Sequence, residues 1–210
     1  DIEMHGGFAH FDLVTPAGRN PVSLQLMGEQ QIPNALAAAS AAFALGISNE
    51  EIATGLTIAK LESKWRMQVV ELKGVQIIQD FYNANPESMK AAIKSLVLLS
   101  QESGGSSWAI LGKMHELGDI EAISHANITR FCVDQGVDHL VSVATNLYMV
   151  EDNQTKGMHL QLHHCSNFED VLQLVENFTG GDVLLLKASR SEKFEDLAEV
   201  IKDKWKGVKS

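Results

Sequence analysis

Residues 183–190 read VLLLKASR, an apolar run of four that is followed directly by a lysine, a serine and an arginine. A short apolar run of this kind is typical of a strand that is buried on both faces, as strands are in parallel sheets. A second run, Ala109-Ile110-Leu111, has the same character and ends at a glycine. The two runs therefore predict an open sheet covered by helices on both faces.

Working outward from these runs, strand and helix patterns alternate along the chain beyond Lys60. This alternation predicts an α/β fold with a Rossmann-like, open and mostly parallel sheet. We predict strands at Met67–Leu72, Val75–Phe81, Trp108–Leu111, His139–Val143, Leu160–His164 and Val183–Lys187, and helices at Pro86–Leu99, Ile123–Gln135, Phe168–Phe178 and Phe194–Trp205.

The first 62 residues follow a different pattern. Apolar and polar residues alternate on both sides of the turn residues PAGRNP at 16–21, which predicts a β-hairpin. Ala35–Leu45 is rich in helix formers and stops at Gly46, and Ser48 is placed to cap a second helix. A hairpin and two helices are few for an independent core, so we expect residues 1–62 to be the end of a larger domain. The chain also starts at Asp1 without a methionine, and we expect it to be part of a longer protein.

Composition excludes several functional classes. The 210 residues include 17 Lys+Arg and 27 Asp+Glu, a net charge of −10, so a general basic surface for nucleic acid or anionic membrane is not expected. No apolar run reaches the roughly 18 residues of a membrane span. The two cysteines, Cys132 and Cys165, are too few for a disulfide framework, and no secretion signal opens the chain. These features predict a cytoplasmic protein without membrane insertion.

Ligands of open α/β sheets bind beyond the carboxyl ends of the strands, so the loops after the predicted strands are the candidate site. In the first such loop, Asp80 offers a carboxylate that accepts hydrogen bonds from ribose hydroxyls, and Asn83 and Asn85 offer donors and acceptors. The alternative is that Asn85 and Pro86 begin the next helix, and both roles are compatible.

Two further loops follow the apolar runs. Residues 111–118 read LGKMHELG, where two glycines allow a close backbone approach to a ligand, or merely form a turn. After the run at 183–186, Lys187, Ser189 and Arg190 are placed to face an anion. The alternative is that Ser191 caps the last helix, with Glu192 in its first turn.

Other chemistry is disfavoured. His159 and His163 on one strand would lie about 13 Å apart, too far to share a metal ion, and His164 would point to the other face, so we predict no metal site. Cys132 lies within an apolar helix pattern and is expected in the core. The sequence has neither G-x-x-x-x-G-K-[ST] nor G-x-G-x-x-G, so we do not expect it to bind a nucleotide tightly unaided.

The stretch DFYNANPESM at 80–89 resembles a signature of the bacterial Mur ligases, D-x-Y-N-A-N-P-x-S-M. The resemblance continues through GEQQIPNALAAA at 28–39, ALG at 44–46, Arg66 and Met67, LGKMHELG at 111–118 and KASR at 187–190. It therefore spans nearly the whole chain.

The resemblance is greatest to the family member that adds D-alanyl-D-alanine to UDP-N-acetylmuramoyl-tripeptide, using ATP and Mg²⁺ through an acyl phosphate. It implies that residues 1–62 end a central ATP-binding domain and that residues 63–210 form the C-terminal ligase domain. The P-loop and most of the magnesium ligands would lie upstream, so this part alone would be inactive and would hold no catalytic residue. The full-length enzyme would be a monomer.

The resemblance also implies roles for individual residues. Asn34 would lie near adenine, Arg66 near the nucleotide phosphates, and Asp80 would bind the ribose. The candidates for the dipeptide side of the site are Tyr82, Asn83, Asn85, Lys187, Ser189 and Arg190. The chain departs from the family pattern at four positions, Gln30, Gln79, Lys113 and Ala188.

Two alternatives to this function remain open at the level of the sequence. One is a sister Mur ligase or a folylpolyglutamate-type ligase with a different amino-acid substrate. The other is a binding module that keeps the Rossmann-like scaffold without catalysis.

Overall fold

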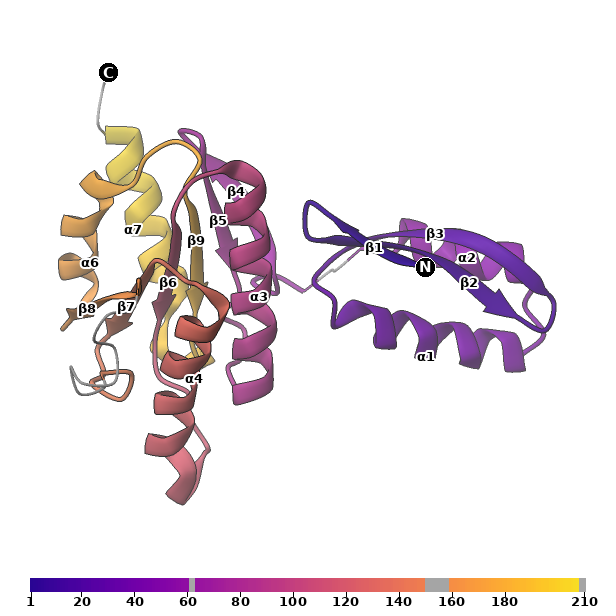
Figure 1. Cartoon of the computed structure of the whole chain (residues 1–210), viewed down its shortest axis with the longest axis horizontal. Helices are drawn as coiled ribbons and strands as arrows, with labels where there is room; N and C mark the ends of the chain where they lie inside the picture. The colour runs from indigo at the N-terminus through magenta and orange to yellow at the C-terminus, as the bar shows by residue number, and fades with distance from the viewer. Residues whose placement is uncertain (61–62, 150–158, 208–210) are drawn as a thin grey trace. The chain divides into compact units, whose positions relative to one another are not determined.

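The computed structural model describes residues 1–60, 63–149 and 159–207. The chain divides into two compact units, Asp1–Ser63 and Lys64–Ser210. Both combine helices and strands, which confirms the predicted α/β class (Figure 1).

The first unit is a three-stranded antiparallel sheet with two helices. The strands are β1 (Ile2–His5), β2 (Phe8–Thr15) and β3 (Gly18–Met27), and the helices are α1 (Gln31–Ala44) and α2 (Asn49–Ile58). The predicted hairpin is the β2–β3 pair, in which Thr15 lies opposite Gly18. The sequence pattern missed β1, whose four residues alternate poorly and are mostly exposed.

The core of this unit comes from one face of the sheet. Phe11 and Leu13 of β2 are buried together with residues of β3, α1 and α2. Ser48 begins α2 as predicted: its hydroxyl accepts the Glu51 N–H, and the Glu51 carboxylate accepts the Ser48 N–H. α1 also exposes the apolar residues Leu36 and Phe43, which lie seven positions apart on one face, and Leu45 is exposed just after its end.

The second unit contains a six-stranded sheet with the order β4-β5-β9-β6-β7-β8. β4 pairs antiparallel with β5, and all other neighbours are parallel, which confirms the prediction of an open, mostly parallel sheet. Every residue of β6 and β9 is buried, as their apolar runs predicted. The strands are β4 (Gln68–Leu72), β5 (Val75–Gln79), β6 (Ser107–Leu111), β7 (His139–Val143), β8 (Gln161–Cys165) and β9 (Val183–Lys187).

Helices cover both faces of this sheet (Figure 1). α3 (Pro86–Ser103) and α4 (Glu121–Gln135) pack on one face, and α6 (Phe168–Leu174) and α7 (Phe194–Gly207) pack on the other. Short 3-10 helices lie at Gly118–Ile120, Val175–Asn177 and Arg190–Glu192. None of the helices in the described residues is long and apolar enough to span a membrane.

Two predicted ends were wrong: β5 ends at Gln79, two residues before Phe81, and the helix predicted to reach Phe178 becomes a 3-10 helix after Leu174. α7 begins at Phe194 as predicted, so the alternative in which Ser191 caps this helix was wrong. The reason is the 3-10 turn at 190–192, which ends with Lys193 in a left-handed conformation and delays the helix.

Candidate functional site

The three candidate loops meet at the carboxyl edge of the sheet. They follow β5, β9 and β6, which are neighbours in that order. The Asp80 N–H donates to the Leu186 carbonyl at 3.0 Å, and the Gly112 N–H donates to the Lys187 carbonyl at 2.9 Å. β9 enters the sheet between strands that are consecutive in sequence, and such a point of reversed strand order is where open α/β sheets bind ligands.

A buried ion pair joins the first loop to β9. The Lys187 Nζ lies 2.6 Å from Asp80 Oδ2, and the two side chains are 1% and 13% exposed. Lys187 also donates to the Asn83 carbonyl at 3.0 Å, and the Met67 N–H donates to Asp80 Oδ1 at 3.2 Å. Burial lowers the pKa of Lys187, and the charge of Asp80 opposes that effect. The Asp80 carboxylate is thus held from both sides.

Asp80 keeps free acceptor capacity in this arrangement. A carboxylate has about four lone-pair positions, and the described contacts of Asp80 are one bond from Lys187 and one from Met67. About two positions therefore remain, which matches the two neighbouring hydroxyls of a ribose. The acceptor chemistry of this carboxylate fits the hydroxyl donors of a nucleoside.

Two arginines at this edge lie over aromatic rings. The Arg66 guanidinium is 4.1 Å from the centroid of the Tyr82 ring, and the Arg190 guanidinium is 4.4 Å from that of Trp65. The Tyr82 N–H donates to the Trp65 carbonyl at 3.2 Å, so the two pairs are adjacent. Arg190 is also paired with Glu195 at 2.6 Å. Arg66 and Tyr82 are exposed, which makes Arg66 a cation available to an anionic ligand.

The second and third loops are tied to each other. The His115 N–H donates to Ser189 Oγ at 2.9 Å, and the Ser189 N–H donates to the Lys113 carbonyl at 3.1 Å. His115 Nε2 also lies 2.5 Å from the Glu192 carboxylate. Lys113, which departs from the family pattern, has its charge paired with Glu121 at 3.0 Å.

The side chain of His125 holds the second loop through a hydrogen bond to its backbone. This buried side chain donates from Nδ1 to the Glu121 carbonyl at 2.8 Å and accepts the Met114 N–H at Nε2 at 2.9 Å. Burial lowers the pKa of His125, in agreement with the neutral ring that this pattern requires. Tyr148 adds a hydrogen bond from its hydroxyl to the Gly112 carbonyl at 2.8 Å. Sequence analysis missed His125, since nothing in its helical spacing separates it from an ordinary core residue.

The remaining predicted residues have local partners. Asn85 caps α3: its Oδ1 accepts the Ser88 N–H at 2.8 Å, which is the structural role given above as the alternative. Asn83 is exposed, and its Oδ1 accepts the N–H of Ala84 at 2.8 Å. Ser189 is buried. Asn34 is exposed on α1 of the first unit, where it donates to Gln31 Oε1 at 3.2 Å. The structure therefore gathers Arg66, Asp80, Tyr82, Asn83, Lys187, Ser189 and Arg190 within one unit.

The histidines considered for metal binding occupy other roles. His159 precedes β8 and pairs with Asp138 at 2.8 Å, while His163 contacts His139 at 3.2 Å between ring nitrogens. Among residues 1–60, 63–149 and 159–207, no group of three or more His, Cys, Asp or Glu side chains is arranged to hold a metal ion. Cys132 is fully buried, and burial raises the pKa of its thiol.

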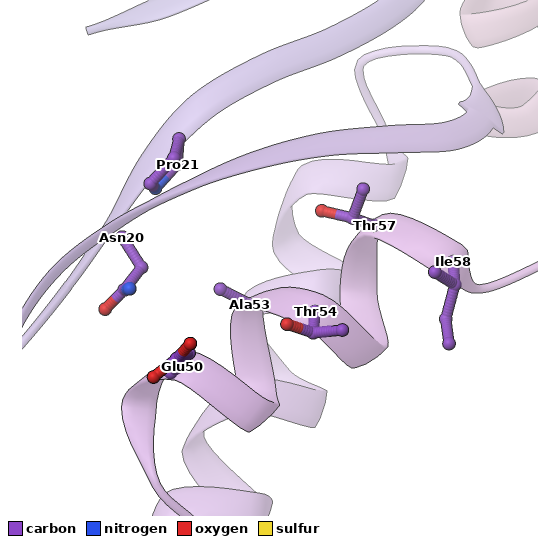
Figure 2. A pocket seen from close by; sticks show the side chains of 7 residues that line it. All are labelled: Asn20, Pro21, Glu50, Ala53, Thr54, Thr57 and Ile58. Carbon is purple, nitrogen blue, oxygen red and sulfur yellow. The ribbon is translucent and has the colours of Figure 1, made fainter.

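The first unit contains a pocket of about 260 Å³ between β3 and α2 (Figure 2). Its lining is Asn20, Pro21, Glu50, Ala53, Thr54, Thr57 and Ile58. None of the predicted site residues lines it. The candidate site is therefore the carboxyl edge of the six-stranded sheet.

Comparison with known proteins gives a match to the family described as "Mur ligase, glutamate ligase domain" over residues 65–190. The chain is 34% identical over 201 residues to the UDP-N-acetylmuramoyl-tripeptide--D-alanyl-D-alanine ligase of Mycobacterium leprae, covering 88% of this chain and 39% of that protein. It is 33% identical to the Bacillus subtilis ligase of the same name, covering 88% and 40%.

The crystal structure of MurF from Acinetobacter baumannii superposes with a TM-score of 0.82 at 30% identity and covers 96% of this chain and 44% of that one. The chain thus spans about two fifths of the length of these relatives.

Proposed function

Because the chain belongs to the Mur ligase family, we propose that it is the carboxyl-terminal part of an ATP-dependent ligase that joins D-alanyl-D-alanine to UDP-N-acetylmuramoyl-tripeptide. The relatives of that name support this function, since the likeness extends over 88% of the chain. The observation that carries it is the carboxyl edge itself, where Asp80 is fixed with acceptor positions to spare and Arg66 is exposed beside it.

Each nucleotide contact in this proposal uses a chemical group that suits it. Asp80 accepts the ribose hydroxyls, Arg66 neutralises phosphate charge, and Asn34 lies near the adenine. ATP supplies the phosphoryl group that activates the tripeptide carboxylate. The chain has no G-x-x-x-x-G-K-[ST] sequence, and no magnesium cluster occurs among its described residues. We therefore infer that the phosphate loop and the Mg²⁺ ligands belong to other parts of the enzyme, and that this chain alone is inactive.

The dipeptide side of the proposed site is formed by the exposed residues of the first and third loops. Tyr82, Asn83 and Arg190 present an aromatic face, an amide and a guanidinium, which suit a small zwitterionic peptide. The side chains of Asn85 and Ser189 shape these loops by accepting hydrogen bonds from the backbone N–H groups of Ser88 and His115.

We further infer that residues 1–62 end the central ATP-binding domain of a monomeric, cytoplasmic enzyme and that residues 63–210 are its C-terminal ligase domain. The exposed apolar face of α1, with Leu36 and Phe43, supports the view that residues 1–62 belong to a larger domain. Such a surface is costly in water and suits a helix whose second face packs inside a larger domain.

The test uses the full-length parent protein. Its release of ADP is expected to require both UDP-N-acetylmuramoyl-tripeptide and D-alanyl-D-alanine, and Arg66→Ala is expected to raise the KM for ATP with little change in the KM for the dipeptide. Turnover with a free amino acid or with glutamate in place of the dipeptide would instead identify a sister ligase. A parent that releases no ADP with any acceptor would contradict the proposal.

A further inference from the structure

We propose that Lys187 is a positioning residue that sets the Asp80 carboxylate for ribose recognition and does not touch the dipeptide. This inference rests on the proposed function, because it assigns Lys187 to the nucleotide side of the same site. The family resemblance placed Lys187 among the candidates for the dipeptide side, whereas its position at the end of an apolar strand predicted only that it faces an anion.

Hydrogen-bond accounting at the ammonium supports the new role. A lysine ammonium has three N–H donors. Lys187 Nζ lies 2.6 Å from Asp80 Oδ2, 3.0 Å from the Asn83 carbonyl and 3.4 Å from the Asp80 carbonyl. All three partners belong to the loop after β5, so no donor remains for a substrate carboxylate.

Burial leads to the same conclusion. The Lys187 side chain is 1% exposed, because β9 lies between β5 and β6 in the sheet. An ammonium that binds a dipeptide carboxylate has to reach the surface of the site. Arg190 and Arg66, in contrast, are both exposed at this edge.

The effect of Lys187 on the nucleotide passes through Asp80. Lys187 occupies one side of the carboxylate and the Met67 N–H occupies the other, so the remaining acceptor positions have a fixed direction. A site built to hydrogen-bond a hydroxyl rejects an analogue that lacks it, because its polar groups are then left unpaired. Loss of Lys187 should therefore weaken discrimination between ATP and 2′-deoxyATP.

The experiment compares wild-type full-length enzyme with Lys187→Met and Lys187→Arg. The control is Lys202→Met, since Lys202 lies on α7 and forms a partly exposed pair with Glu199 one turn away. For each protein, kcat/KM is measured with ATP and with 2′-deoxyATP, and the KM for D-alanyl-D-alanine is measured at saturating ATP. We expect Lys187→Met to reduce the ATP preference about tenfold and to leave the dipeptide KM within about twofold. Lys187→Arg keeps the charge and should retain part of the preference.

A second variant guards against loss of folding. Lys187→Met combined with Asp80→Asn removes both buried charges, so it should fold while its preference for ATP over 2′-deoxyATP stays low. An increase of about tenfold in the dipeptide KM for Lys187→Met or for the double variant, with the ATP preference intact, would overturn the inference and leave the proposed function standing.

Nucleotide binding separates the two claims. If wild type shows no dipeptide-dependent turnover, the proposed function fails, but titration calorimetry with ATP and 2′-deoxyATP still tests Lys187. Equal affinities of wild type for the two nucleotides would then refute the role of Lys187 as well.

Discussion

The Asp80–Lys187 pair couples the stability of the second unit to its candidate site, and a double-mutant cycle measures that coupling. Asp80→Ala leaves the Lys187 ammonium buried without a counter-charge. Lys187→Met likewise leaves the Asp80 carboxylate without its counter-charge. Removing one partner of a buried ion pair costs about 3–5 kcal/mol, whereas replacing both is often nearly neutral.

The magnitude of the coupling follows from the contacts that each variant loses. Each single variant should lower the free energy of unfolding by about 3–5 kcal/mol. The double variant leaves no unpaired charge, but the Met67 N–H and the Asn83 carbonyl lose their partners. It should therefore lower the free energy of unfolding by about 1–3 kcal/mol. The sum of the single effects then exceeds the double effect by at least about 3 kcal/mol.

Tryptophan fluorescence is well suited to this measurement. The three tryptophans, Trp65, Trp108 and Trp205, all belong to the Lys64–Ser210 unit, so a urea titration of the chain reports on that unit alone. Lys90→Met is a matched control, because Lys90 loses only a surface pair with Glu87. Surface pairs contribute about 0–1 kcal/mol.

Two results would refute this reasoning. If either single variant costs less than about 1 kcal/mol, the pair is not the desolvated contact that the structure shows. If the two effects are additive, Asp80 and Lys187 do not depend on each other.

Three further predictions concern stability and the exposed helix. Gly105→Ala would place a Cβ 2.2 Å from the Gly181 carbonyl and should lower the midpoint of thermal unfolding, measured by circular dichroism. The control is Gly55→Ala, whose Cβ would meet no atom within 4 Å and should not lower the midpoint. Equal midpoints for the two variants would contradict the close approach at Gly105. Burial lowers the pKa of His125 below 6.5, so at acidic pH this histidine is protonated more readily in the unfolded chain than in the folded one. The free energy of unfolding should therefore fall as the pH drops through about 6.5. A urea midpoint at pH 5.5 equal to the midpoint at neutral pH would contradict this prediction. Because Leu45 is exposed, we expect the chain by itself to associate through this apolar surface and Leu45→Lys to reduce that association in light scattering, with a stability change within about 0.5 kcal/mol; equal light scattering by the two proteins would contradict this expectation.

The fold of the second unit was predictable because its strands carry a strong signal. Residues 183–186 and 109–111 are apolar throughout, and every position of β6 and β9 is in fact buried. The strand order was not predictable in the same way. Placing β9 between β5 and β6 depends on contacts between residues about a hundred positions apart, and local periodicity carries no information about them.

The candidate site was predictable to the level of loops, but the contacts within it were not. Asp80 and Lys187 were both selected, each from its position at the end of a strand, yet the family resemblance assigned them to different ligands. His115 and Glu192 are 77 residues apart, and their contact exists only because β6 and β9 are neighbours. Trp65 was not selected, since its role depends on the position of Arg190 above its ring.

These contacts tie the loops of the carboxyl edge to one another within the protein. β9 is the centre of the arrangement: Lys187 at its end holds the loop after β5, and Ser189 two residues later holds the loop after β6. Lys187 and Ser189 are both buried, and their side chains form hydrogen bonds with other groups of the protein. The loop atoms that remain exposed are therefore fixed by residues that face inward, and fixed groups bind a ligand with less loss of conformational entropy. The chain carries a net charge of −10, yet exposed Arg66 is held on Tyr82 at this edge. Local placement of cations, rather than the overall charge, thus suits this edge to an anionic nucleotide.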